Sequence, residues 1–253
     1  MNTLIVMALI LFGLMVWVGG KKGAKSYASL FINFGIIIAL LFFMVDPKMN
    51  PIILTLLASV LIVCVNLFYV NEVNLKTKLA FVSTMVTLII LFAFIYIMTN
   101  ITMIQGFGEE EIDELAPFSL LIGIDFVKVS VSIVIISTVG AMTDVAIAIS
   151  SPLRELMVHN PQMDRKDLFS SGMRIGRDIL GTDTNTLFFA FIGGYLALVL
   201  WFKDLSYSIG DIANSKVFVA EVVTILSASI GIAIVIPITS WINAYYLTRK
   251  QKE

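Results

Sequence analysis

The chain has 253 residues, of which 58% are hydrophobic and only 14% are charged. A soluble domain carries about 25% charged residues, so this composition cannot cover a water-facing surface and predicts a membrane protein. The net charge of −1 argues against a nucleic-acid partner, and the single Cys64 excludes an internal disulfide.

Seven apolar stretches are long enough to cross a bilayer, which takes about 20 residues of helix. No Lys or Arg precedes the first stretch, which favours a retained helix over a signal peptide. We therefore expect an all-α, polytopic membrane helix bundle that forms a single integral membrane domain. The predicted spans are residues 2–18, 29–45, 51–70, 79–98, 122–149, 180–202 and 217–247.

The basic residues alternate between the two sides of these spans. Of the 17 Lys and Arg residues, 13 fall in the connections after the first, third, fifth and seventh spans. Connections rich in Lys and Arg stay in the cytoplasm. The sequence therefore predicts an N-terminus outside the cell and a cytoplasmic C-terminus.

The longest cytoplasmic connection, residues 150–179, is predicted to be helical. Ser151 followed by Pro152 is typical of a helix start, and Pro161 interrupts the chain. Asp164 is placed to cap a second helix, which would lie at the cytoplasmic interface and lead into the sixth span. An ordinary amphipathic connector is the alternative interpretation.

Asp144 is the most unusual residue of the fifth span, because a carboxylate in lipid is costly and often functional. Thr143 precedes it, and Gly140 and Ala141 would let another helix approach closely one turn earlier. Asp144 lies about 20 residues into its span and so in the predicted cytoplasmic half. Burial there would favour the protonated acid. The alternatives are a carboxylate at the water interface or one held in a structural hydrogen bond.

A second polar cluster opens the sixth span at about the predicted depth of Asp144, so the two could meet. Three of its residues, Thr182, Asn185 and Thr186, lie on one helical face at spacings of three and four residues. Helix capping is an alternative explanation for Asp183, but it explains the deeper residues less well. The cluster comprises Thr182, Asp183, Thr184, Asn185 and Thr186, with Arg177 and Asp178 just before it.

Polar residues near the outer ends of two spans are secondary candidates. Asp125 and Lys128 are three residues apart and are expected to pair at the interface. Glu221, early in the seventh span, is expected to reach the headgroups. Pro237 in the same span predicts a kink.

Small residues four apart predict close helix packing at Ala190 and Gly194 and at Ser227 and Gly231. No Walker loop, nucleophile–base pair or cluster of metal ligands is visible, and the only histidine is His159. We therefore expect no enzymatic activity, no metal and no cofactor.

Two motifs carry a resemblance to a known family. They are GAMTDVAIAISSPLREL and SSGMRIGRDILGTDTNTLFFAFIGG, supported by GFGEEE before the fifth span and IPITSWINAYY in the seventh. Over about Gly106 to Ile242 the chain resembles the YibE/F-like family of bacterial multi-pass membrane proteins. It lacks the extracytoplasmic insert of longer members and so looks like the short YibF type. The resemblance implies a bacterial cytoplasmic membrane location and a longer YibE-type partner.

A weaker resemblance concerns the resistance-nodulation-division permeases and the SecD/SecF export subunits. In these proteins a Gly-x-x-x-Asp helix is followed by a cytoplasmic loop and by a helix rich in Ser and Thr that ends in Gly-Gly. Gly140 to Asp144 and the Gly193-Gly194 pair follow that order here. The analogy implies permease-like helix packing and a proton-cycling role for Asp144. This chain has one aspartate where the drug pumps have two, and it lacks their periplasmic domains.

Two functions follow as hypotheses. The first is a membrane subunit of a proton-coupled transporter or exporter, in which Asp144 exchanges a proton beside Thr184, Asn185 and Thr186 and a partner completes the path. The second is a non-transporting scaffold that stabilises a partner, with the same residues in a static core. The sequence leaves open whether the chain also forms a homo-oligomer.

Overall fold

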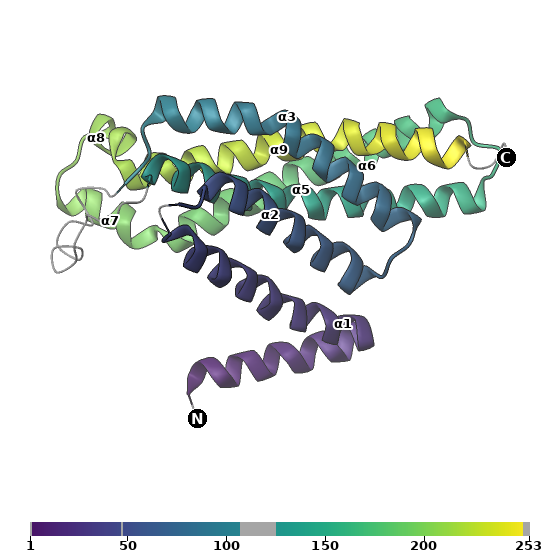
Figure 1. Ribbon diagram of the computed structural model, residues 1–253, viewed down its shortest axis with the longest axis horizontal. Helices are drawn as coiled ribbons and strands as arrows, with labels where there is room; N and C mark the ends of the chain where they lie inside the picture. Colours follow the sequence, from purple (N-terminus) through teal and green to yellow (C-terminus); the bar gives the residue numbers. More distant parts are fainter. Residues whose placement is uncertain (1, 47, 107–124, 250–253) are drawn as a thin grey trace.

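The computed structural model describes residues 2–46, 48–106 and 125–249, and the described part is an all-α bundle (Figure 1). The predicted first three residues of span five, 122–124, and the GFGEEE motif from residue 107 onward lie outside the described residues. In chain order the elements are α1 (Thr3–Met44), α2 (Pro51–Cys64), the π-helix η1 (Val65–Tyr69), α3 (Leu75–Thr102), α5 (Phe126–His159), α6 (Arg165–Gly194), α7 (Leu196–Asp204), α8 (Ile209–Asn214) and α9 (Lys216–Arg249).

Within the described residues, five helices are long and apolar enough to cross a membrane, or six if the bent pair α6–α7 is one span. The fold class is confirmed, whereas the count of seven spans and their orientation stay predictions. The difference arises at the N-terminus, where α1 continues through residues that the sequence assigns to a loop.

α1 consists of two arms that reverse direction at Gly20 (Figure 1). Gly20 has φ 54° and ψ −134°, a conformation open essentially to glycine. The arms then pack closely, because a Cβ on Gly23 would overlap the carbonyl oxygen of Met15. The rings of Phe12 and Tyr27 lie 5.0 Å apart across the reversal. The first two predicted spans correspond to these arms.

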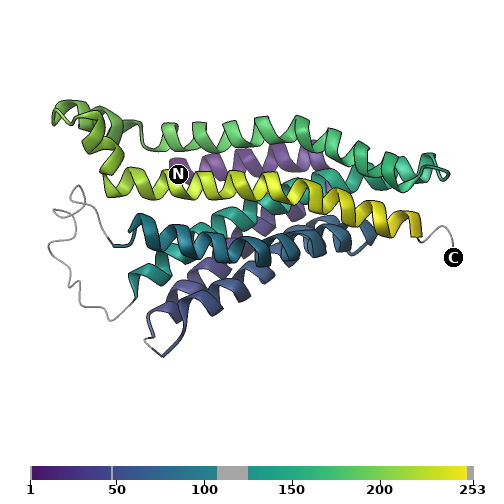
Figure 2. The same cartoon turned by 90° about the horizontal axis from the view of Figure 1, so that it is seen from above.

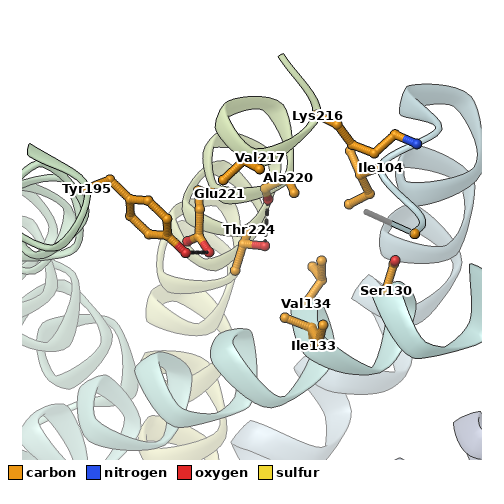
Figure 3. Close-up of a pocket in the computed structure, with 11 residues that line it drawn as sticks. Ile104, Ser130, Ile133, Val134, Tyr195, Lys216, Val217, Ala220, Glu221 and Thr224 are labelled. Carbon is orange, nitrogen blue, oxygen red and sulfur yellow. Dashed lines mark hydrogen bonds between the residues drawn. The ribbon is translucent and has the colours of Figure 1, made fainter. Parts of the chain in front are cut away.

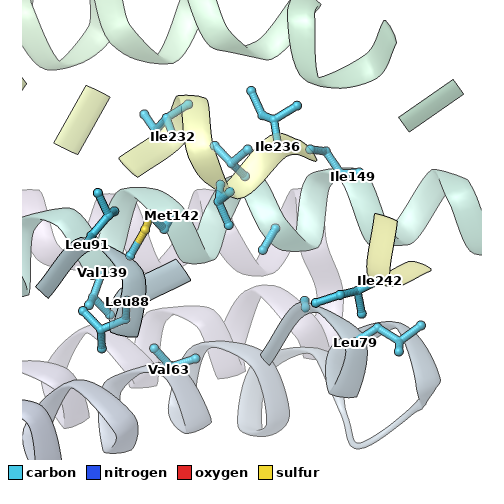
Figure 4. Packing of buried hydrophobic residues seen from close by; sticks show 14 of the residues in the cluster. Val63, Leu79, Leu88, Leu91, Val139, Met142, Ile149, Ile232, Ile236 and Ile242 are labelled. Atoms are coloured by element: carbon cyan, nitrogen blue, oxygen red, sulfur yellow. The ribbon is translucent and has the colours of Figure 1, made fainter. Parts of the chain in front are cut away.

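α5 and α9 form the centre of the bundle, with α3 and α6 packed against both (Figures 1 and 2). Val131, Ile135, Met142 and Ile149 recur on one face of α5 and are fully buried. They belong to one buried cluster with side chains of α3 and α9; Figure 4 shows Met142 near Leu91 and Ile149 near Ile236. Because lipid is as apolar as these side chains, close van der Waals packing rather than escape from water holds the helices together.

Two glycine seams let helices approach α9 closely. A Cβ on Gly231 would lie 2.8 Å from Thr138 Cγ2 on α5, which confirms the close packing predicted at Ser227 and Gly231. A Cβ on Gly172 of α6 would lie 2.6 Å from Ser240 Oγ, and one on Gly176 would overlap Ile236. This Gly-x-x-x-Gly pair in α6 was not among the predicted contacts.

The close contacts predicted at Gly140 and Gly194 are wrong, because a Cβ at either position would meet no atom within 4 Å. Spacing alone does not show which face of a helix is covered. The partners of α5 lie on its other faces, whereas Gly194 lies five turns beyond Gly176 on the same face of α6, at a level that no described residue packs against closely.

The predicted helix start at Ser151 and Pro152 is also wrong, because α5 runs through both residues to His159. Pro152 removes the N–H that would bond the carbonyl of Ala148, which lies on the exposed side of α5. Leu153 just beyond it is completely buried, so core packing keeps the helix continuous. α9 runs through Pro237 without a break, and the kink predicted there stays a prediction.

The second half of the connector behaves as predicted. Asp164 caps α6 by accepting a hydrogen bond from the N–H of Asp167, 2.7 Å away. α6 then continues without interruption to Gly194, with Leu168 buried in the core. Its first half is therefore packed against the bundle, and the position predicted for it at the cytoplasmic interface stays a prediction.

The predicted sixth span, residues 180–202, is broken at Tyr195, where α6 and α7 meet at 54°. Gly193 and Gly194 are poor helix formers, and a Cβ added at either would meet no atom within 4 Å, so no close side-chain packing holds the helix straight there. The bend turns the chain toward the first turns of α9.

Candidate functional site

Asp144 lies within α5, seven residues before Ser151 and so about 10 Å from it along the helix axis. Ser151 Oγ accepts a hydrogen bond from Lys76 Nζ at 3.0 Å, which marks the basic end of the bundle. Neighbouring Thr143 and Val145 are buried, but the Asp144 side chain is exposed. The predicted burial of Asp144 within this chain is therefore wrong, because its face of α5 is only partly covered.

The register of α5 and α6 brings Asp144 level with the polar cluster. A Cβ on Gly172 would lie 3.0 Å from Leu153 Cδ1, so these residues are level. Nine residues separate Leu153 from Asp144, and nine separate Gly172 from Gly181 in the returning helix. Asp183 is two residues further on, and the carboxylates of Asp144 and Asp183 are close enough to interact electrostatically.

Neither carboxylate forms a hydrogen bond or ion pair with another residue in the described part of the chain. The ion pairs in that part are Lys25–Glu72 and Lys128–Asp125. The nearest hydroxyls are already used. Thr143 Oγ1 donates to Val139 O at 2.6 Å within its own helix. The arrangement is thus two unpaired acids on adjacent helices, and it lacks the hydrogen-bonded network expected around Asp144.

The rest of the α6 cluster is more exposed than a static core would be. Thr182 and Asn185 are exposed, and Thr184 is half-buried. Thr186 is exposed and donates to Thr182 O at 2.9 Å, so it too is satisfied within α6. The exposed members Thr182, Asn185 and Thr186 therefore share one polar face of α6, which the rest of the described residues leave open.

The secondary candidates divide into two groups. Arg177 and Asp178 are exposed on α6, one to two turns before Asp183. Lys128 pairs with Asp125 at 3.1 Å at the opposite end of the bundle, as predicted. Arg177 and Asp178 therefore lie at a different level of the bundle from Asp125 and Lys128, and the four residues do not form one site.

Glu221 does more than reach toward headgroups. Its Oε1 accepts a hydrogen bond from the Tyr195 hydroxyl at 2.9 Å, and both residues line a cavity of about 160 Å³ (Figure 3). Tyr195 comes from the α6–α7 break and Glu221 from the first turns of α9. The sequence offered no signal for this pair beyond the Gly-Gly that precedes Tyr195.

Two asparagines missed by the sequence analysis link α1 to the π-helix. Asn33 Nδ2 donates to Asn66 Oδ1 at 2.7 Å, and Asn71 Nδ2 donates to Asn66 O at 3.1 Å. Asn66 lies inside η1, and π-helical turns often mark functional positions. Polar residues in two predicted spans were the available signal.

The described residues hold no group of three or more His, Cys, Asp or Glu side chains that could bind a metal ion. The chemistry available at Asp144 and Asp183 is proton exchange or the acceptance of hydrogen bonds. His159 is exposed at the end of α5.

Comparison with protein families matches the chain over residues 7–249 to the family described as YibE/F-like protein. The match covers most of the chain, which therefore belongs to this family and is a membrane-type helical protein. Neither curated proteins nor solved structures give a match.

Proposed function

We propose that this YibE/F-like protein is the membrane subunit of a proton-coupled transporter or exporter, in which Asp144 and Asp183 carry the proton. The observation that carries the proposal is their juxtaposition: two acids on adjacent helices, level with one another and without a hydrogen bond or ion pair among the described residues.

Two carboxylates in one site favour states in which one of them holds a proton, because protonation removes their repulsion. A proton that arrives or leaves then changes the force between α5 and α6. α6 is held to α9 by the Gly172 and Gly176 seam, and Asp183 lies seven residues beyond Gly176 on the same face of α6, so a change at Asp183 acts on a packed helix. Such a linkage between charge and helix position is what proton coupling needs.

The exposure of Asp144 supports a second protein at this face. An ionisable side chain at membrane depth normally faces a bundle interior or a water-filled cavity rather than lipid. A YibE-type partner would cover Asp144 and the open polar face of α6 and complete the proton path. The substrate would be handled by the complex.

The test is proton movement in sealed vesicles that contain this chain with its YibE-type partner, followed with a pH-sensitive dye under an imposed gradient. We expect Asp144→Asn and Asp183→Asn to abolish coupled proton movement, because neither amide can take up a proton. Asp178→Asn is the matched control, since Asp178 is an exposed acid of α6 outside the pair. Unchanged flux in Asp144→Asn would show that the proposal is wrong.

The alternative is a non-transporting scaffold, and one observation favours it. The first arm of α1 has no buried residue, so much of its apolar surface is available to another membrane protein. A scaffold predicts that Asp144→Asn lowers the amount of assembled partner without any change in pH-dependent flux. Partner pull-down alongside the flux assay separates the two functions.

A further inference from the structure

The cavity at Tyr195 and Glu221 lies at the end of the bundle opposite the basic connections, far from Asp144. Three helices and a bend form it: the end of α3 at Ile104, the first turns of α5 at Ser130 and Val134, the first turns of α9, and the α6–α7 break. Its volume of about 160 Å³ is smaller than the roughly 300–1,000 Å³ of drug-sized pockets. An occupant would therefore present only a few heavy atoms.

Opposite charges stand on different sides of this cavity. Figure 3 shows Lys216 extending over Ile104, away from the side where Tyr195 meets Glu221. Lys216 and Glu221 do not pair with one another; the ion pairs found in the described residues involve other groups. Each charge is half-buried and remains able to bind a group of the opposite sign.

The hydroxyls of the lining fix the balance of donors and acceptors. Ser130 Oγ donates to Phe126 O at 3.0 Å and Thr224 Oγ1 donates to Ala220 O at 2.8 Å, so both offer the cavity only acceptor lone pairs. The Tyr195 hydroxyl donates to Glu221, whose carboxylate keeps further acceptor positions. Among the described lining residues, Lys216 is then the side chain that still offers hydrogen-bond donors.

We propose that this cavity binds a small zwitterion, whose ammonium group donates to Glu221 and whose anionic group accepts from Lys216. An ammonium group brings three N–H donors to a lining rich in acceptors, and the anionic group matches Lys216, the cation among the described lining residues, which forms no ion pair with any of them. A free small amino acid has this chemistry, and so does the headgroup of phosphatidylethanolamine. The site is independent of the acid pair at Asp144.

The first arm of the test measures free ligands on the purified chain in detergent by calorimetry. L-alanine is compared with propionate, which lacks the ammonium, and with ethylamine, which lacks the carboxylate. The second arm measures retained lipid by native mass spectrometry with phosphatidylethanolamine, phosphatidylcholine and phosphatidylglycerol. Phosphatidylcholine keeps the charges but has no N–H donor.

If the proposal is correct, alanine or phosphatidylethanolamine binds at least about tenfold more tightly than its analogues, as expected for a charged hydrogen bond. Alanine identifies a soluble ligand, and phosphatidylethanolamine identifies a lipid. Glu221→Gln and Lys216→Gln should each weaken that binding about tenfold. Asp125→Asn, at the same end but outside the cavity, should leave it unchanged.

Three results would overturn the proposal. They are equal binding of the zwitterion and its analogues, no binding of either zwitterion, and full binding by both cavity variants. Thermal unfolding of Glu221→Gln and Lys216→Gln checks that the variants fold. If one does not fold, Tyr195→Phe replaces it, because freeing the Glu221 oxygen should change zwitterion affinity without removing a charge.

Discussion

The seam between α6 and α9 gives the sharpest prediction about stability. A Cβ added at Gly176 overlaps Ile236 Cγ2 and lies 3.1 Å from Cγ1 and 3.2 Å from Cβ of the same residue. Ile236 is β-branched and buried, so no rotation about χ1 relieves all three contacts. Gly176→Ala must therefore push α6 away from α9. Gly181→Ala is the matched control, because its added Cβ meets no atom within 4 Å.

The magnitude follows from two opposing effects. Replacing glycine by alanine within a helix stabilises it by about 1 kcal/mol. Overpacking costs about 1–3 kcal/mol. Gly181→Ala should therefore gain up to about 1 kcal/mol, whereas Gly176→Ala should range from about neutral to a loss of about 2 kcal/mol.

The assay is thermal unfolding of both variants in the same detergent. For a chain of this size about 1 kcal/mol corresponds to about 2–4 °C, so Gly176→Ala should melt several degrees below Gly181→Ala. Adding Ile236→Ala should remove the clash and make the two changes less than additive. If Gly176→Ala melts at or above Gly181→Ala, the inferred close contact is wrong.

Three further predictions concern the periphery of the bundle. Gly20→Ala should destabilise the chain by about 1–3 kcal/mol in thermal unfolding, because φ 54° strains any other residue. Asn66→Leu should cost about 0.6–1.7 kcal/mol in the same assay by removing the hydrogen bond from Asn33. Hydrogen bonds from Ser208 hold the pKa of Asp211 below its ordinary value, so the α8 cap is stabilised above that ordinary value and lost as the pH falls through the lowered one. The protection of the α8 amides from hydrogen exchange, taken relative to the intrinsic exchange rate at each pH, should fall over that range.

Each of the three has a control. Gly13→Ala adds a Cβ in open space and should not destabilise the first arm of α1. Asn100→Leu removes a hydrogen bond only to its own helix, at Tyr96 O, and should cost less than Asn66→Leu. Ser208→Ala should raise amide exchange in α8 already at neutral pH. Equal effects in a variant and its control would contradict the corresponding argument. So would a protection of the α8 amides, relative to the intrinsic exchange rate, that does not change with pH.

The sequence by itself determined the fold class, because continuous apolar runs of about 20 residues can cross lipid with every backbone hydrogen bond satisfied when they form helices. It also located the acids. The number of residues between each acid and the end of its predicted span was enough to predict that Asp144 and the cluster around Asp183 lie at the same depth, because a helix rises 1.5 Å per residue.

Only the tertiary structure decided which face of each helix is covered. Asp144 is exposed because α6 packs mainly against α9 through Gly172 and Gly176, a choice that no local pattern around Asp144 records. For the same reason Pro152 sits inside a continuous helix, since the buried Leu153 beside it outweighs the local preference for a helix start. The contact between Tyr195 and Glu221 likewise depends on a bend that brings two distant segments together. Spacing along one helix fixes how far apart two residues lie along its axis and whether they share a face. Contacts between helices depend on how all the helices pack together.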